Sequence, residues 1–415
     1  MGQTLREYWV PVMLSEELPD TDGDPMRVRL LGEDLVIFRA TDGRIGLLKE
    51  SCSHRGASLF FGRNEENGIR CVYHGWKYDV TGQCVDMPNE PEASNFKDKV
   101  PSRAYTCTEY GGMIWTYMGQ AATPPALPDL EWANVPAENR QMNSVQRESN
   151  WVQALEGDID TSHLFFLHAR LNPDDPPSLG AYHADKHPKL EVVKTDYGLV
   201  YGANRDEDEN TTYWRVTQFM FPFHTLFPGY PDGTVPGHIW VPLDDEHTMV
   251  WSIQWNPVVP MSESVMARQR QGPGVGEFLP VESHGLGRWR PRARASNDYE
   301  IDRQLQRTKT FTGIPTIPLQ DQAVVESMGM VTDRSIEHLG TSDGMVIQVR
   351  RRLIAAALAH AADGTLPPGV TNPEWYRVRS VSGTLPKGAS WLEEMDDWLN
   401  ARTTTIPDVI LAVPR

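Results

Sequence analysis

The sequence of 415 residues contains only four cysteines, namely Cys52, Cys71, Cys84 and Cys107. This number excludes the dense disulfide framework of small secreted domains, and in a reducing compartment paired cysteines indicate a metal site. The sequence also has no run approaching the roughly 20 apolar residues that a membrane helix needs. Its start, MGQTLREYWV, lacks the layout of a signal peptide. These absences predict a soluble, cytoplasmic protein that has no membrane partner.

Basic residues are also scarce, since 39 Lys and Arg face 56 Asp and Glu, for a formal net charge of −17. Nucleic-acid binding relies on clustered basic side chains, so this balance argues against a nucleic-acid partner. The sequence has no convincing Gly-rich dinucleotide fingerprint. A redox reaction of this protein would therefore obtain electrons from NAD(P)H only indirectly, through a separate reductase.

The first part of the chain has the pattern of short strands separated by turns. Residues 27–50 read RVRLLGEDLVIFRATDGRIGLLKE and residues 103–118 read RAYTCTEYGGMIWTYM, which are β-rich runs with glycine turns between them. The Pro-rich QAATPPALPDL follows. We therefore predict an all-β domain over residues 1–120 and a linker over 121–145.

The remainder, residues 146–415, reads as a larger α+β domain. Strand patterns at 190–203, 212–223, 237–244 and 247–255 precede helical patterns near 319–329 and 343–362. This order predicts an antiparallel sheet packed against helices.

Two Cys/His pairs form the first candidate metal site. The sequence has Cys52-x-His54 and Cys71-x2-His74, with sixteen residues between His54 and Cys71. Thiolate and imidazole ligands suit zinc or an iron–sulfur cluster. Because each half supplies one residue of each kind, the pattern favours a [2Fe–2S] cluster with two cysteines on one iron and two histidines on the other. Cys84 and Cys107 match no ligand pattern.

A second candidate metal site lies in EGDIDTSHLFFLH, within a segment that reads as helical from residue 150 to 168. His163 and His168, close to acidic residues such as Asp160, would supply the two histidines of a 2-His-1-carboxylate iron site. Residues five apart on a regular helix point in different directions, so the helix must end or bend if His163 and His168 share a metal. Asp160 and His163 do share a face, so Asp160 can accept the proton of the imidazole nitrogen that is not bound to metal.

Both motifs, in this order, resemble the oxygenase (alpha) subunit of Rieske non-haem iron oxygenases. The resemblance extends through IPLQDQAVVESMGMVTDRSIEHLG and is similar to the phthalate-type branch, with phenoxybenzoate dioxygenase and aryl O-demethylases. It covers most of residues 40–360, and the last fifty residues are not diagnostic. It implies an N-terminal Rieske domain and a catalytic domain of the helix-grip type.

The resemblance also implies roles for particular residues. Cys52, His54, Cys71 and His74 match the cluster ligands, and His163, His168 and Asp321 match the ligands of a mononuclear Fe(II). From the residues alone, Glu326 would serve as well as Asp321. Asp160 matches an aspartate that links the iron site to a cluster histidine of the adjacent subunit, which here would be His74.

That link implies a homotrimer or a stacked pair of trimers. The implied partner is a flavin/[2Fe–2S] reductase, and the implied reaction activates O2 to hydroxylate a small aromatic acid or methoxylated aromatic, by cis-dihydroxylation or O-demethylation. Alternatives are a Rieske monooxygenase or N-demethylase acting on a non-aromatic substrate, a Rieske electron-transfer protein, and a zinc-binding interaction protein.

Three residues are candidates for substrate contact. Arg215 lies on a predicted apolar strand and could bind a carboxylate, although a surface arginine at a strand edge fits equally well. Phe165 lies inside the ligand motif. Phe221 belongs to an alternating aromatic set that is more typical of a sheet core than of a pocket.

Overall fold

The structure is a computed structural model that describes residues 2–91, 93–171, 187–230, 232–263, 266–267 and 274–411. The chain forms two compact units. The first comprises Met1–Leu127, Pro242–Asp244 and Pro280–Arg288, and the second comprises Pro128–Val241, Asp245–Leu279 and Trp289–Arg415. The two later segments of the first unit were not foreseen from the sequence. One is held through Arg29, whose Nε donates to Asp244 Oδ2 at 2.8 Å.

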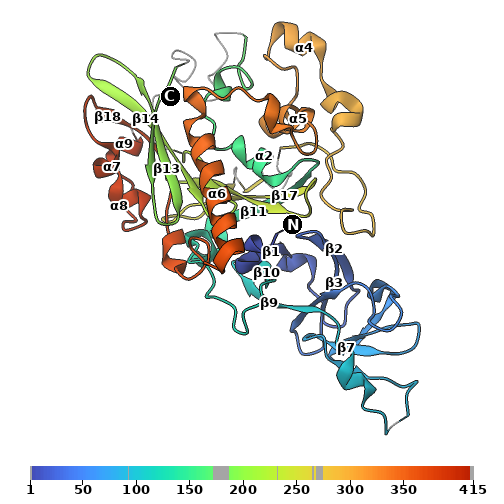
Figure 1. Cartoon of the computed structure of the whole chain (residues 1–415). Helices are drawn as coiled ribbons and strands as arrows, with labels where there is room; N and C mark the ends of the chain where they lie inside the picture. The colour runs from blue at the N-terminus through green and yellow to red at the C-terminus, as the bar shows by residue number, and fades with distance from the viewer. Residues whose placement is uncertain are drawn as a thin grey trace. The chain divides into compact units, whose positions relative to one another are not determined.

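The first unit is built almost entirely of antiparallel strands (Figure 1). Its larger sheet has, in spatial order, β1 (Trp9–Leu14), β10 (Met113–Tyr117), β9 (Ala104–Tyr110), β4 (Ile45–Lys49), β3 (Glu33–Arg39) and β2 (Met26–Leu30). The predicted hairpin between β9 and β10 is present. Gly111 and Gly112 both have positive φ, at 64° and 83°, as a type I′ turn requires.

A second, smaller sheet of the first unit carries the Cys/His loops. Its strands are β5 (Arg63–Glu65), β6 (Gly68–Arg70), β7 (Lys77–Asp79) and β8 (Cys84–Asp86). Buried side chains of both sheets, including Phe38, Leu48, Ile69 and Tyr78, form one hydrophobic cluster. This cluster anchors the loops from which the candidate ligands project.

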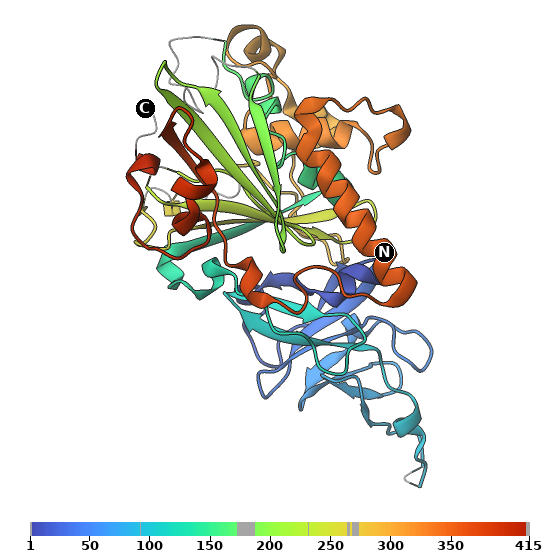
Figure 2. The same cartoon turned by 60° about the vertical axis from the view of Figure 1, so that its left-hand side comes forward.

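The second unit contains an antiparallel sheet of eight strands (Figure 2). The strands, in spatial order, are β11 (Arg140–Arg147), β17 (Thr248–Trp255), β16 (Val235–Pro242), β15 (His224–Leu226), β14 (Thr211–Met220), β13 (Gly198–Asp206) and β12 (Lys189–Lys194), with β18 (Val381–Pro386) paired to β14. The segment predicted as a linker thus includes the beginning of β11.

Helices cover this sheet and carry part of the candidate site. Among the described residues, the α-helices given bounds are α1 (Glu131–Asn134), α2 (Trp151–Glu156), α4 (Arg303–Thr308), α5 (Ile317–Ser327), α6 (Gly344–Asp363), α7 (Trp391–Glu394), α8 (Asp396–Leu399) and α9 (Asp408–Leu411). The long α6 lies over β12 and β13 (Figures 1 and 2), while α5 packs near α2. The predicted all-β first domain and α+β second domain are confirmed.

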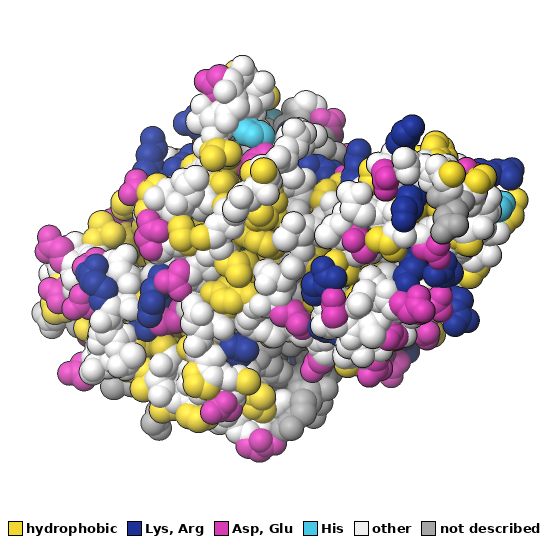
Figure 3. Space-filling model, turned by 90° about the horizontal axis from the view of Figure 1, so that it is seen from below, with side chains coloured by type: hydrophobic (Ala, Val, Ile, Leu, Met, Phe, Trp, Pro, Cys, Tyr) yellow, Lys and Arg dark blue, Asp and Glu magenta, His cyan; other side chains and the backbone are white. Residues whose placement is uncertain are grey.

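Charged side chains of both signs are interspersed over the described part of the face in Figure 3. Among the described residues, no helix is both long enough and apolar enough to cross a membrane.

Candidate active site

Two short loops of the first unit present the four Cys/His ligand candidates. The backbone N–H of Gly56 donates to the carbonyl of Cys52, and that of Gly75 to the carbonyl of Cys71, each at 2.9 Å. Both glycines have positive φ, 77° and 78°, a conformation that side chains with a Cβ adopt rarely. The glycine two residues after His54 and the glycine directly after His74 thus close two equivalent turns.

The donor atoms of these loops converge. Nδ1 of His54 lies 3.1 Å from Nδ1 of His74, and the two cysteines are buried. Burial raises the pKa of the Cys52 thiol, and the neighbouring Cys71 sulfur adds to this rise. Trp76 stacks on the His54 ring at 4.5 Å between centroids. A pair of inner sulfurs and a pair of half-exposed imidazole nitrogens is the donor set that a Rieske cluster needs, so the residues fit this group.

His163, His168 and Asp321 of the second unit come together although Asp321 is far away in sequence. Their ligand atoms all lie within 4.8 Å of one another. Nε2 of His168 is 3.2 Å from Asp321 Oδ1, and Nε2 of His163 is 3.6 Å from the same oxygen. Two imidazoles and one carboxylate that converge in this way are the donor set that would hold a non-haem Fe(II), so these residues also fit.

The other ring nitrogen of each histidine faces its own acceptor. Nδ1 of His163 is 3.5 Å from Asp160 Oδ2, and Nδ1 of His168 is 2.7 Å from Gln320 Oε1. The Nε2 atom of Gln320 in turn donates to the carbonyl of Ile314 at 3.0 Å. Such contacts orient a histidine so that Nε2 is left for a metal. The role of Gln320 was missed from the sequence, although its position directly before Asp321 was a usable signal.

In the triad formed by His163, His168 and Asp321, and at the neighbouring Asp160, the electrostatics favour ionised carboxylates. Burial would raise the pKa of Asp321, but its hydrogen bond to His168 and the nearby histidines outweigh burial and lower this pKa. The pKa of Asp160 is lowered in the same way, because the hydrogen bond and charge of His163 outweigh burial. An ionised carboxylate is the form that binds a metal or accepts an imidazole proton.

The chain brings His163 and His168 together by ending its helix early. The segment predicted as helical to residue 168 forms α2 only to Glu156, and a short 3-10 helix follows at His163–Phe165. Between them Asp160 Oδ1 accepts a hydrogen bond from the backbone of Ser162 at 2.6 Å, which stabilises a turn instead of a helix. As a result the two imidazole centroids are 5.1 Å apart.

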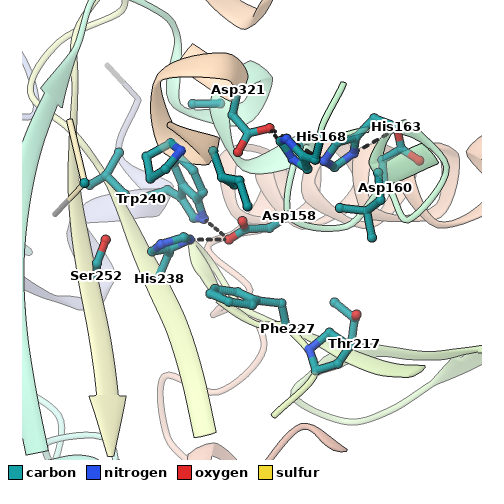
Figure 4. Close-up of a pocket in the computed structure, with 18 of the residues that line it drawn as sticks. Asp158, Asp160, His163, His168, Thr217, Phe227, His238, Trp240, Ser252 and Asp321 are labelled. Atoms are coloured by element: carbon teal, nitrogen blue, oxygen red, sulfur yellow. Dashed lines mark hydrogen bonds and ion pairs between the residues drawn. The ribbon is translucent and has the colours of Figure 1, made fainter. Parts of the chain in front are cut away.

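The triad lines a cavity of about 810 Å³ in the second unit (Figure 4). Arg215 lies on its wall, as do Arg147, Asp158, His238 and Trp240, none of which was singled out from the sequence. These four residues lie on β11, on β16 and after α2, and their scattered positions carry no local motif.

The two aromatic candidates for substrate contact lie elsewhere. Phe165 and Phe221 do not line this cavity. Phe165 is buried with Arg205 over its ring, 4.4 Å from the centroid, and Phe221 is buried beside Phe219 at 5.4 Å. Both side chains are buried and serve the core instead: Phe165 ends the 3-10 helix His163–Phe165, and Phe221 directly follows β14.

Glu156, at the end of α2, is held away from this cavity wall by two arginines. Arg350 Nε donates to Glu156 Oε1 at 2.6 Å, and Arg334 Nη1 donates to Oε2 at 2.8 Å. These contacts tie α2 to α6 and to the segment after α5. Glu156 therefore supports the position of the ligand-bearing turn without facing the cavity.

Comparison with known proteins agrees with the first metal motif. Residues 8–101 match the family model "Rieske [2Fe-2S] domain", and residues 116–406 match "LigXa C-terminal domain like". The oxygenase subunit of 3-chlorobenzoate-3,4-dioxygenase from Comamonas testosteroni is 41% identical, over 94% of this chain and 93% of that protein. The oxygenase subunit of phthalate 4,5-dioxygenase from Pseudomonas putida is 40% identical, over 94% and 90%.

Solved structures show the same fold at lower identity. NdmB of Pseudomonas putida CBB5 aligns with a TM-score of 0.63 at 19% identity, covering 89% of this chain and 96% of that chain. Dicamba monooxygenase aligns with a TM-score of 0.60 at 18% identity, covering 87% and 100%.

The chain belongs to the Rieske oxygenases, in the branch of the phthalate dioxygenase oxygenase subunits. It is the terminal oxygenase component of a multicomponent oxidoreductase whose Rieske domain holds a [2Fe–2S] cluster.

Proposed function

We propose that this oxygenase acts on an aromatic carboxylic acid at a mononuclear Fe(II) held by His163, His168 and Asp321. When bound, the Rieske cluster supplies single electrons and the ferrous ion supplies the centre at which O2 is activated. The protein side chains hold these groups, exclude water and place the substrate ring.

The observation that carries the substrate proposal is a pair of arginines on the wall of the cavity that contains the triad. Arg147 is only 6% exposed, and its buried Nε has no hydrogen-bond partner in the described part of the chain. Its guanidinium carbon lies 5.3 Å from the centre of the Trp240 ring. Burying a cation is unfavourable unless it is paired, so an anionic ligand would stabilise this arrangement. Asp321 and Glu326 feel the charge of Arg147 at longer range.

A carboxylate is the anion that fits both the site and the relatives. Guanidinium groups bind carboxylates through paired, charge-assisted hydrogen bonds, and the two relatives named above act on 3-chlorobenzoate and phthalate by their names. With the carboxylate held by Arg147, the ring would lie beside Trp240, on the same cavity wall.

We further propose that Cys52, His54, Cys71 and His74 hold the cluster, and that electrons pass from His74 to Asp160 of a neighbouring subunit in a ring of three. In support, His74 is only half-buried and is flanked by the exposed side chains of Val72 and Tyr73, 59% and 56% accessible. Asp160 contacts the ring nitrogen of His163 that does not face Asp321. The expected reductase is a flavin/[2Fe–2S] protein.

The test is a product screen with the purified holoenzyme, a compatible reductase, NADH and O2. Benzoate, phthalate, chlorobenzoates and methoxybenzoates are supplied one at a time, beside the corresponding benzamides as neutral controls. We expect O2 uptake coupled to product with the acids and not with the amides. A cis-diol would define a dioxygenase and formaldehyde an O-demethylase. Equal turnover of acids and amides would contradict the proposed carboxylate binding.

A further inference from the structure

Asp158, on the cavity wall, forms a hub of three hydrogen bonds, of which Figure 4 shows those with His238 and Trp240. Its Oδ2 lies 2.5 Å from Thr225 Oγ1, 2.8 Å from His238 Nδ1 and 3.1 Å from Trp240 Nε1. The hub joins the chain that follows α2 to strands β15 and β16. Asp158 is distinct from the triad, and it was not singled out in the sequence.

These contacts determine which nitrogen of His238 carries a proton. An indole N–H can only donate, and Trp240 Nε1 also lies 2.9 Å from Thr225 Oγ1. Thr225 can therefore accept from Trp240 and donate to Asp158. Oδ2 of Asp158 already accepts from Thr225 and from Trp240 and so carries no proton, which leaves His238 Nδ1 as the donor in their contact. In the neutral imidazole Nε2 is then a hydrogen-bond acceptor.

Nε2 of His238 has no hydrogen-bond partner in the described part of the chain. The side chain is 19% exposed, and the residue lines the cavity that contains His163, His168 and Asp321. Its ring is fixed between Phe227, 5.0 Å away between centroids, and Trp240, 5.1 Å away. Asp158 is already satisfied by Thr225 and Trp240, so His238 is not needed merely to satisfy its carboxylate.

The charges around His238 select the kind of group that Nε2 would bind. The nearby Asp158 carboxylate disfavours a substrate anion at this place, whereas a hydroxyl group can donate to a neutral imidazole. Arg147 adjoins the same indole ring, with its guanidinium carbon 5.3 Å from the Trp240 centroid. One aromatic ring could therefore present a carboxylate to the arginine and a hydroxyl to the histidine.

We propose that His238, oriented by Asp158, binds a hydroxyl substituent of the substrate, so that the preferred substrates are hydroxylated aromatic acids. This inference rests on the proposed function, because it assumes that the cavity binds an aromatic acid. It adds a specificity-determining residue on the wall of that cavity.

The experiment is calorimetric titration of the anaerobic holoenzyme with 2-, 3- and 4-hydroxybenzoate and with the three methylbenzoates of matching shape. We expect at least one hydroxybenzoate to bind about tenfold more tightly than its methyl counterpart, as one hydrogen bond to a partly buried acceptor allows. In the His238→Asn variant the amide keeps a donor for Asp158 but places no atom at Nε2. The preference should fall to within about twofold, with methylbenzoate affinity unchanged.

The Ser252→Ala variant, which removes a hydroxyl at a different position on the cavity wall, should keep the preference. Thermal unfolding and the visible cluster spectrum show whether each variant is folded. Equal binding of hydroxy and methyl compounds by the unchanged protein would overturn the inference, and that measurement does not depend on any variant. A preference that survives in His238→Asn would overturn it as well. If no benzoate binds at all, the proposed aromatic-acid function fails, and the inference fails with it.

Discussion

Each histidine of the triad is oriented by a different kind of acceptor. Asp160 is a carboxylate that faces Nδ1 of His163, whereas Gln320 offers an amide oxygen to Nδ1 of His168. A carboxylate makes the attached imidazole a stronger electron donor than an amide does, because it stabilises positive charge on the ring. Substituting Asp160 and Gln320 in turn should therefore separate the effect on metal binding from the effect on electron transfer to the iron.

Replacing His163 with Ala should abolish substrate oxidation and leave the visible spectrum of the Rieske cluster intact. The reason is that His163 belongs to the triad in the second unit, whereas the cluster candidates lie in the first. Iron analysis should show the loss of one iron per chain, with two retained. Oxygenation that persists in this variant would refute the proposed iron site.

Replacing Gln320 with Leu should weaken iron binding by about 10- to 100-fold without removing a ligand, because His168 loses the acceptor that orients it. Competition with a calibrated chelator measures the affinity. Gln304→Leu is the matched control, since Gln304 is an exposed glutamine on α4. Similar affinities in the two variants would show that the contact to Gln320 is dispensable.

At the scale of elements, a buried ion pair ties the beginning of the second unit to its last strand. Arg379, just before β18, donates through Nε to Glu131 Oε2 at 2.7 Å and through Nη2 to Oε1 at 2.5 Å. Trp255 of β17 donates to the same carboxylate at 2.9 Å. The side chains of Arg379 and Glu131 are only 1% and 8% exposed, so neither charge can be compensated by water.

Arg379→Leu should therefore lower the free energy of unfolding of the second unit by about 3–5 kcal/mol, because Glu131 is left buried and without its cation. Denaturant unfolding followed by tryptophan fluorescence gives the value. The neighbouring pair Arg377–Asp129 is 54% and 33% exposed at 3.4 Å, so Arg377→Leu should cost less than about 1 kcal/mol. A loss in Arg379→Leu as small as in the control would mean that Glu131 finds other partners.

At the scale of the whole molecule, function depends on electrons that the chain does not obtain by itself. The net charge of −17 disfavours an acidic partner through long-range repulsion. The proposed ring of three also requires a cluster and an iron site from two different chains. The contribution of neighbouring subunits can be measured without knowing the substrate preference in detail, provided that one substrate is turned over.

Two variants that are inactive alone should complement each other if electrons cross between subunits. Cys52→Ser removes a cluster ligand candidate and His163→Ala removes an iron ligand candidate. Co-expression with different affinity tags and tandem purification yields mixed rings. Each mixed head-to-tail ring of three has one site that combines an intact iron site with an intact cluster of its neighbour, so these rings should restore about a third of the unmutated activity. Activity that stays at the level of the separate variants would indicate transfer within one chain.

Local sequence patterns were informative where the relevant residues are close in the chain. The hairpin at Gly111–Gly112 was predictable because a two-residue turn with positive φ demands glycine. The length of α2 was overestimated, because the pattern of apolar residues continues past Glu156 while the turn at Asp160 competes with the helix. From the sequence, Phe221 was a candidate both for the pocket and for the sheet core. Alternation shows which residues share a face of β14 and of the segment that extends it, but it does not show which face lines the pocket.

The sequence by itself determined the kind of metal chemistry, because Cys52, His54, Cys71 and His74 lie in two short loops whose spacing and glycines are local properties. Only the tertiary structure decided between Asp321 and Glu326. Five residues apart on α5, they point in different directions, and Asp321 meets both histidines while Glu326 accepts from Tyr299 at 2.5 Å. The cavity wall was likewise decided by folding, since strands distant in sequence bring Arg147 and His238 to one indole ring.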